Sequence, residues 1–369
     1  MGDNGVVNVN PEPLTFDDVI RVARHGAAVQ LTDDAMAAIS AARQRVDELA
    51  ESPVPSYGIS TGFGALATRH IDPALRAQLQ RSLVRSHAAG NGPEVETEVV
   101  RALMLLRLHT LATGHTGIRP TTAKTLAALI SAGITPVVHE YGSLGCSGDL
   151  APLAHVALTL MGEGVVRDEY GNVTPAEEAL KQAGIEPVEL AAKEGLALIN
   201  GTDGMLGMLI LAIDDLTRLV RTADVSAAMS VEGLLGTDRV FAPELQALRP
   251  QPGQALSAAN MTKILNNSGI MASHRDPAAC TRVQDAYSLR CAPQVAGAAR
   301  DTITHAANVA TWELASAVDN PAVLSDGRVE SNGNFHGAPV AYVLDFLAIV
   351  AADVASISER RTDRFLDKS

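Results

Sequence analysis

The residues of this chain with the clearest chemical potential are three consecutive ones, Cys146, Ser147 and Gly148, within the segment GSLGCSGDL. Gly148 has no Cβ, so its backbone nitrogen can approach the carbonyl carbon of Cys146 in a conformation that most residues cannot reach. Closing a bond between these atoms, with loss of water from the ring and from the Ser147 side chain, would give a methylidene-imidazolone. The segment could therefore make an electrophile from its own backbone.

The residues that follow this segment predict the element that positions it. Asp149 to Pro152 have the composition of a helix cap and first turn, since proline is tolerated there, and LAHVALTLM continues with helical periodicity. The start of a helix carries partial positive charge. We therefore expect a helix to direct its positive end at Ser147.

The motif by itself leaves other interpretations open. GCSG could be only a glycine-rich turn. A thiol nucleophile at Cys146 is also possible, with His139 or His155 as its base, and nothing in the spacing favours either histidine. The nucleophile elbow of hydrolases is excluded, because it needs glycine two residues after the serine and Asp149 stands there.

Composition limits the class of protein. The net charge is −13 without a basic run, which argues against nucleic acid and anionic membrane surfaces as partners. The three cysteines form no CxxC pair, so we expect a reducing compartment and neither a disulfide framework nor a metal site. The N-terminus is polar and lacks the pattern of a secretion signal, so the sequence predicts a cytoplasmic protein.

The coarse pattern predicts a mainly α fold with few short strands. Short hairpins are expected around 165–173 and 323–330, where EYGN and SDGR supply the turns. Helices are expected where apolar periodicity is bounded by glycine or proline, at 15–24, 32–51, 73–88, 95–113, 121–132 and 150–162.

Two later segments, 205–220 and 339–357, are strongly apolar, but aspartates interrupt both. We therefore predict buried bundle helices rather than membrane spans. The second is apolar on nearly every face, so it must be covered on most sides, which indicates an obligate oligomer. A boundary near 200–204 predicts an N-terminal active-site domain, 1–204, and a central helical bundle domain, 205–369.

The segment GSLGCSGDLAPLAHVAL resembles the signature of the aromatic amino-acid ammonia-lyases, and the whole chain resembles their histidine-specific, actinobacterial type. Several matching blocks in one order are far more specific than one short pattern. Six further blocks carry the resemblance: YGISTGFGAL (57–66), RSHAAGNGP (85–93), TGHTGIRP (113–120), LINGTDGMLGM (198–208), QDAYSLRCAPQV (284–295) and ESNGNFHGAPVAYVLD (330–345).

The resemblance implies a histidine ammonia-lyase, which eliminates ammonia from L-histidine to give trans-urocanate in histidine degradation. It implies the ammonia-lyase fold with a central long-helix bundle, a homotetramer with active sites shared between subunits, and a methylidene-imidazolone as the sole cofactor, without metal or nucleotide. The alternatives are a phenylalanine or tyrosine ammonia-lyase or aminomutase on the same scaffold, or an inactive truncated oligomerisation partner. His87 favours histidine as the substrate.

The resemblance also assigns residue roles. Cys146, Ser147 and Gly148 form the ring, and Cys146 stands where the family usually has alanine, which leaves the closure intact because only its carbonyl takes part. The catalytic positions are completed by Tyr57, a candidate general base on a mobile loop, by Asn200, which bonds to the ring and substrate, and by Tyr287. The substrate-binding positions are His87 for the imidazole, Arg290 for the carboxylate, and Gln284 and Phe335 in the lining.

Full-length relatives continue well beyond residue 369, and that part holds further bundle helices and an active-site glutamate. The chain is therefore interpreted as truncated at its C-terminal end, either as a fragment or as a genuine short protein. We expect the 369-residue polypeptide by itself to be poorly soluble and essentially inactive.

Overall fold

The computed structural model describes residues 5–52, 56, 58–62, 71–168, 170–276, 278–280 and 282–367. The chain forms two compact units. Unit 1 comprises Met1–Leu211 with Ala310–Ala341, and unit 2 comprises Ala212–Val309 with Tyr342–Ser369. The units are thus not contiguous segments, because 310–341 packs with the N-terminal part and the first boundary falls at 211 rather than at 204.

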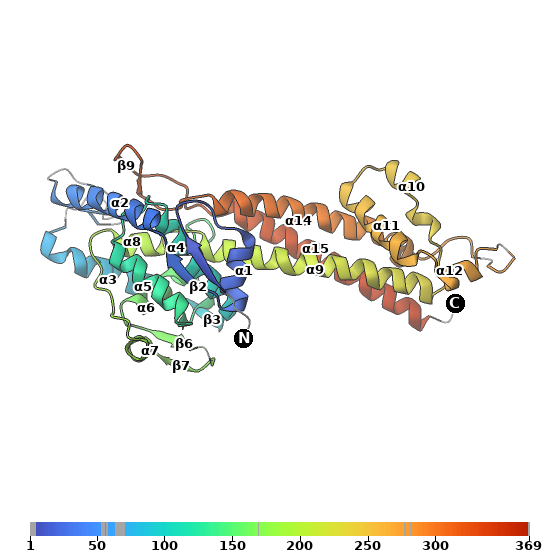
Figure 1. The fold of residues 1–369 in the computed structure, drawn as a ribbon, viewed down its shortest axis with the longest axis horizontal. Coiled ribbons are helices and arrows are strands. Elements are labelled where there is room, and N and C mark those ends of the chain that lie inside the picture. The colour runs from blue at the N-terminus through green and yellow to red at the C-terminus, as the bar shows by residue number, and fades with distance from the viewer. Residues whose placement is uncertain are drawn as a thin grey trace. The chain divides into compact units, whose positions relative to one another are not determined.

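Unit 1 is built around helix α4 (Thr97–Ala112), in which every residue from Val99 onward is buried. Helices α1 (Phe16–His25) and α5 (Pro120–Ser131) pack against it (Figure 1). The predicted helices of this unit are confirmed to within a few residues at each end. The remaining helical elements of the unit are α2 (Asp33–Glu51), a short 3-10 turn (Pro73–Leu75), α3 (Arg76–His87), α6 (Leu150–Leu160), α7 (Ala176–Ala183) and α8 (Glu194–Ile199).

The strands that the structure describes in unit 1 are short and form four small sheets. Both predicted hairpins are present, while the pairings between strands far apart in sequence were not predicted. The antiparallel pairs are β3 (Asn91–Glu94) with β5 (His139–Tyr141), β4 (Thr135–Pro136) with β6 (Val165–Arg167), β6 with β7 (Val173–Pro175), and β8 (Ala322–Val323) with β9 (Val329–Glu330), and the parallel pair is β1 (Val6–Val9) with β2 (Ala28–Leu31).

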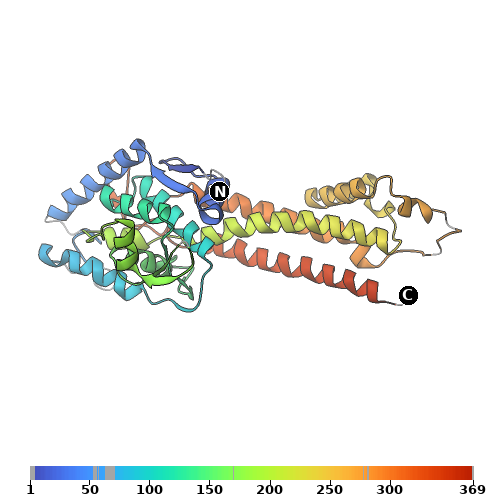
Figure 2. The ribbon, with the colours of Figure 1, turned by 60° about the horizontal axis from the view of Figure 1, so that its bottom comes forward.

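Unit 2 contains long stretches of three helices that run alongside one another: α9 (Asp203–Gly233), α14 (Ala292–Leu314) and α15 (Ala338–Leu366) (Figures 1 and 2). A buried ion pair, Arg300 Nη2 to Asp224 Oδ2 at 2.6 Å, joins α14 to α9. Shorter elements complete the unit: a 3-10 turn (Arg239–Phe241), α10 (Pro243–Ala247), α11 (Pro252–Leu265), α12 (Gly269–Ser273) and α13 (Tyr287–Arg290).

Two helical stretches among the described residues have the length and apolar composition that a membrane span needs, Glu194–Gly233 and Ala338–Leu366. The first has 89% of its apolar window buried inside the protein, as in a core helix of a soluble protein. The second has only 22% of its window buried, and Tyr342 and Ile349 are about two-thirds exposed. Both predicted helices are present, but this chain leaves most of α15 uncovered.

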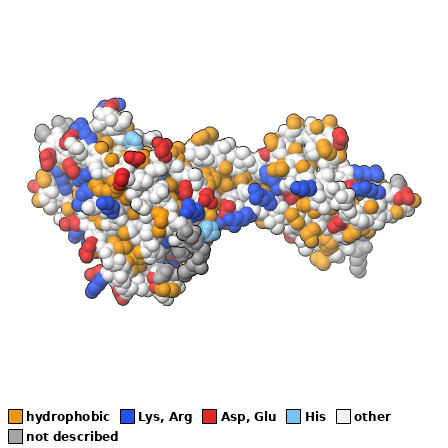
Figure 3. Space-filling view, in the orientation of Figure 1, with side chains coloured by type: hydrophobic (Ala, Val, Ile, Leu, Met, Phe, Trp, Pro, Cys, Tyr) orange, Lys and Arg blue, Asp and Glu red, His pale blue; other side chains and the backbone are white. Residues whose placement is uncertain are grey.

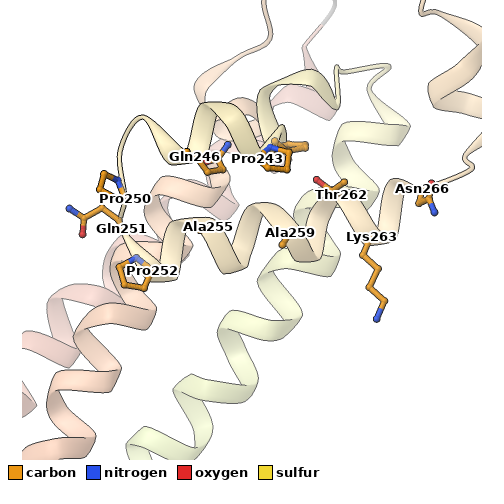
Figure 4. A pocket seen from close by; sticks show the side chains of 12 residues that line it. Pro243, Gln246, Pro250, Gln251, Pro252, Ala255, Ala259, Thr262, Lys263 and Asn266 are labelled. Atoms are coloured by element: carbon orange, nitrogen blue, oxygen red, sulfur yellow. The ribbon is translucent and has the colours of Figure 1, made fainter.

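Apolar side chains also reach the surface over α10 and α11, as Figure 3 shows for the region labelled α10 in Figure 1. Leu245, Leu248 and Leu256 are each about half exposed or more. A groove of about 780 Å³ lies between the two helices (Figure 4). Among the described residues that line it, only Lys263 is charged, so the groove contains no carboxylate and no histidine for acid–base chemistry.

Candidate active site

The loop that carries Ser147 connects β5 to α6 and closes on itself in a tight turn. The amide of Gly148 donates to the carbonyl of Gly145 at 3.1 Å, and the amide of Leu144 donates to the carbonyl of Gly148 at 3.3 Å. Ser147 is half-buried and Cys146 is exposed. The glycine-rich sequence is therefore used as predicted, to bend the backbone at the serine.

Gly148 is the position where the site requires glycine. Its φ is +75°, in the region that side chains disfavour. An added Cβ would collide with the carbonyl oxygen of Gly201 and would lie 3.3 Å from the carbonyl oxygen of Phe335. The loop is thus pressed against the neighbour of Asn200 and against Phe335, so the structure brings three predicted site segments together.

Asp149 occupies the cap position of α6, but its side chain makes no capping bond to that helix. Its Oδ2 instead accepts a hydrogen bond from the amide of Met205, in the first turn of α9, at 2.9 Å. Its own amide donates to the carbonyl of Gly201 at 2.7 Å. Asp149 therefore fastens the loop to the start of α9, a distant partner that local sequence could not reveal.

Burial raises the pKa of Asp149 to about 6, and the nearby Asp203 acts in the same direction. Hydrogen bonds from Ser143 and from the amide of Met205 oppose the increase without cancelling it. The carboxyl group is only 1% exposed, so water contributes little to stabilising its charge.

This shift predicts a stability that depends on pH. The folded protein holds the Asp149 proton more tightly than the unfolded chain. The contribution of this carboxyl group to the free energy of unfolding is therefore full below about pH 4 and is lost as pH rises through about 6. The free energy of unfolding falls by on the order of 3 kcal/mol over this range. Asp149→Asn keeps an acceptor for Met205 and cannot ionise, so its melting temperature should rise relative to wild type between pH 4.5 and 7.5. A constant difference across this range would contradict the assignment.

Asn200 ends α8, a short helix that is buried throughout. Its Nδ2 donates to the carbonyl of Asn320 at 3.0 Å, and its own carbonyl accepts from Arg107 Nη1 at 3.1 Å. Arg107 is fully buried and forms an ion pair with Asp203 at 3.1 Å. Neither Arg107 nor Asn320 is predictable from local sequence, because their partners lie far along the chain.

His87 lies at the end of α3 and is half-buried. Its Nδ1 lies 2.9 Å from the carbonyl of Leu83, so Nδ1 donates and Nε2 is left as an acceptor in the neutral ring. No described residue bonds to Nε2. Gly90, three residues later, packs against Gly142, so this segment borders the Ser147 loop.

The alternative of a cysteine nucleophile receives no support from the geometry. The Nε2 of His155 accepts from the amide of Gly90 at 3.3 Å, and the ring faces His139 edge-on at 5.9 Å. Within the described residues the Cys146 thiol approaches only the Ser147 hydroxyl, at 3.8 Å. Among the histidines that the structure describes, none is bonded to the Cys146 thiol.

Three further predicted residues, Gln284, Tyr287 and Arg290, lie in unit 2. The guanidinium carbon of Arg290 lies 4.6 Å from the centroid of the Tyr287 ring, and its Nε donates to the carbonyl of Asp285 at 2.9 Å. Gln284 precedes this short helix, and Arg361 holds it from α15 through the carbonyl of Ser288. Tyr57 lies outside the described residues. The predicted site thus forms two groups, one within each unit.

Two solved structures define the class of protein to which this fold belongs. A tyrosine aminomutase structure from Streptomyces globisporus matches with a TM-score of 0.90 at 38% identity, covering 98% of this chain and 71% of that one. Histidine ammonia-lyase from Trypanosoma cruzi matches with a TM-score of 0.87 at 37% identity, covering 97% and 67%. The predicted mainly α ammonia-lyase fold is therefore confirmed, and the chain is a carbon–nitrogen lyase.

The particular family follows from the sequence. The profile described as aromatic amino acid lyase matches residues 14–369. Histidine ammonia-lyase of Streptomyces griseus is 67% identical over 363 residues, which cover 98% of this chain and 70% of that protein. The chain belongs to the aromatic amino acid lyase family.

Proposed function

We propose that the protein eliminates ammonia from L-histidine to give trans-urocanate, on a methylidene-imidazolone made from Cys146, Ser147 and Gly148. The observation that carries this proposal is the tight turn at Gly148, which leaves no room for a Cβ beside the Gly201 carbonyl and Phe335. The choice of histidine is supported by 67% identity to a histidine ammonia-lyase, against 38% to the tyrosine aminomutase.

The chain's own atoms account for the ring. The Gly148 nitrogen bonds to the carbonyl carbon of Cys146, and one water leaves with the oxygen of that carbonyl and the amide hydrogens of Gly148 and Ser147. A second water leaves with the Ser147 hydroxyl and its Cα hydrogen. Once formed, the ring supplies the electrophile that an α-amino acid needs to lose its amine at neutral pH.

The polar groups of the predicted site residues suit histidine. The Nε2 of His87 can accept the N–H of a substrate imidazole, because its Nδ1 is already engaged with the Leu83 carbonyl. The Nη atoms of Arg290 form a planar fork for the substrate carboxylate. Tyr57 is proposed as the general base, and Asn200, Gln284, Tyr287 and Phe335 as the other contacts.

We propose a cytoplasmic homotetramer in which the group around Arg290 completes a site formed by Ser147, Asn200 and His87. The apolar side chains that α15 exposes supply a surface for the subunits to bury.

The test of this function is release of urocanate, followed by its absorbance, with L-histidine, L-phenylalanine and L-tyrosine supplied separately. We expect turnover of histidine to exceed that of the other two by a wide margin. Faster turnover of phenylalanine or tyrosine would overturn the histidine assignment and leave the family assignment intact.

His87→Leu should weaken histidine turnover selectively. The substrate imidazole would lose its acceptor, and leaving a buried polar group unpaired costs about 1–3 kcal/mol, or roughly 5- to 150-fold in kcat/KM. The same variant should impair phenylalanine turnover much less. An equal loss on both substrates would show that His87 does not contact the imidazole.

A further inference from the structure

Behind Asn200 lies an ion pair that is fully buried on both sides. Lys193 Nζ is 2.5 Å from Asp319 Oδ2, and both side chains are 0% exposed. Lys193 also donates to the carbonyl of Thr116 at 2.7 Å. Burial lowers the pKa of the lysine, and the carboxylate of Asp319 opposes that effect.

The backbone of Lys193 is itself unusual. It has a φ of +69°, one of three positive values among the described residues other than glycine. A side-chain-bearing residue in this region is strained unless its surroundings hold it there. Here the residue forms the cap position of α8, and its ammonium group is held by Asp319.

Asp319 and Asn320 are adjacent, and between them they hold both ends of α8. Asp319 pairs with Lys193 at the first end, and the Asn320 carbonyl accepts from the Asn200 side chain at the last. The Asp319 carboxylate also accepts from the amide of Asn320 at 2.8 Å, so the two contacts are linked directly. The position of the Asn200 amide therefore depends on where Asp319 lies.

The same two residues hold the segment that leads to Phe335. The Asn320 side chain accepts from the amide of Asn332 at 2.9 Å, and the Asp319 carbonyl accepts from the Asn332 side chain at 3.0 Å. Phe335, three residues later, lies against Gly148. Asp319 and Asn320 together therefore position two groups that border the Ser147 loop, which are Asn200 and the segment of Phe335.

Stability alone is a weak reason for such a pair. Removing two charges from water costs several kcal/mol each, and apolar residues of similar volume often replace a buried ion pair without loss of stability. We propose that Lys193 and Asp319 are positioning residues for the reaction, which fix Asn200 and the segment of Phe335 against the Ser147 loop without touching substrate. This inference rests on the proposed function in assigning Asn200 and Phe335 to the site.

The test compares Lys193→Met/Asp319→Asn with Glu194→Gln in the full-length protein. The double variant removes the charge pair but keeps an acceptor for the Asn320 amide. Glu194 is a matched control, because it is equally buried at the start of α8 and bonds to Arg119 and Thr122 instead. We expect both variants to lower the melting temperature, whereas only the double variant lowers kcat, by about 100-fold, with a smaller change in KM.

Hydrogen exchange gives a readout that does not need turnover. Amides of residues 331–337 should exchange faster in the double variant and at the wild-type rate in Glu194→Gln. Asp319→Glu serves as a second variant if the double variant does not fold. It keeps the charges but displaces Asn320, so it should lower kcat about 10-fold. Unchanged exchange and kcat in these variants, or equal losses in the Glu194 control, would overturn the inference. A wild-type protein that releases no urocanate would instead overturn the proposed function, and the exchange data would still test the pair.

Discussion

Replacing Ser147 by alanine should abolish turnover while leaving the fold intact. Alanine has no hydroxyl to lose as water, so the ring cannot gain its methylidene carbon. The side chain is half-buried in a turn held by backbone bonds, so its loss removes little packing. We expect kcat to fall roughly 1000-fold or more, the scale seen when a group that acts covalently is removed.

Mass spectrometry of the peptide 142–150 provides the direct measurement. The wild-type peptide should weigh two waters less than its sequence, and the Ser147→Ala peptide should not. Cys146→Ala is the matched control: its side chain is exposed and takes no part in closure, so both the mass deficit and the activity should persist. An active wild-type preparation with an unmodified peptide would falsify the proposed ring.

Arg290→Ala should produce the second large effect. Loss of a charge-assisted pair to a substrate carboxylate costs on the order of 2–5 kcal/mol, so kcat/KM should fall by roughly 30-fold to several thousand-fold. The Nε of Arg290 is already bonded to the Asp285 carbonyl, which aims the fork and leaves both Nη atoms for a ligand. Arg290→Lys should restore little, because an ammonium cannot make paired bonds.

Steady-state kinetics with L-histidine would measure this effect. Arg275→Ala is a suitable control, since Arg275 is more than half exposed and its ion pair with Asp238 is of a kind that contributes at most about 1 kcal/mol. Unchanged kinetics in the Arg290 alanine variant would remove this residue from the site.

Local features of the sequence predicted most of the helices in unit 1. The predicted ranges 15–24 and 32–51 begin at Thr15 and Thr32, and the structure shows each threonine accepting a capping bond from the amide three residues later. The turn at Ser147 was predictable for the same reason, since glycine marks where a backbone bends. These signals depend only on neighbours.

The contacts that assemble the site could not be predicted from local sequence, because they join residues far apart in the chain. Asp149 resembles an ordinary helix cap, yet its side chain bonds to an amide 56 residues later. The partners Lys193 and Asp319 are separated by 126 residues, and no periodicity links them. The family resemblance supplied Asn200 and Phe335 as site residues, but it did not identify what holds them.

The close packing of the backbone at Gly148 and Gly201 limits how this scaffold could be adapted to new substrates. A methyl group on Gly201 would collide with the Asp203 carboxylate and come within 2.5 Å of Arg107 Nη2, and one on Gly148 would collide with Gly201 itself. Libraries for directed evolution should therefore keep both glycines and the buried charges around them constant. Diversity is better placed at His87 and Phe335, which are only half-buried, so that new side chains change the surroundings of Ser147 and not the turn that carries it.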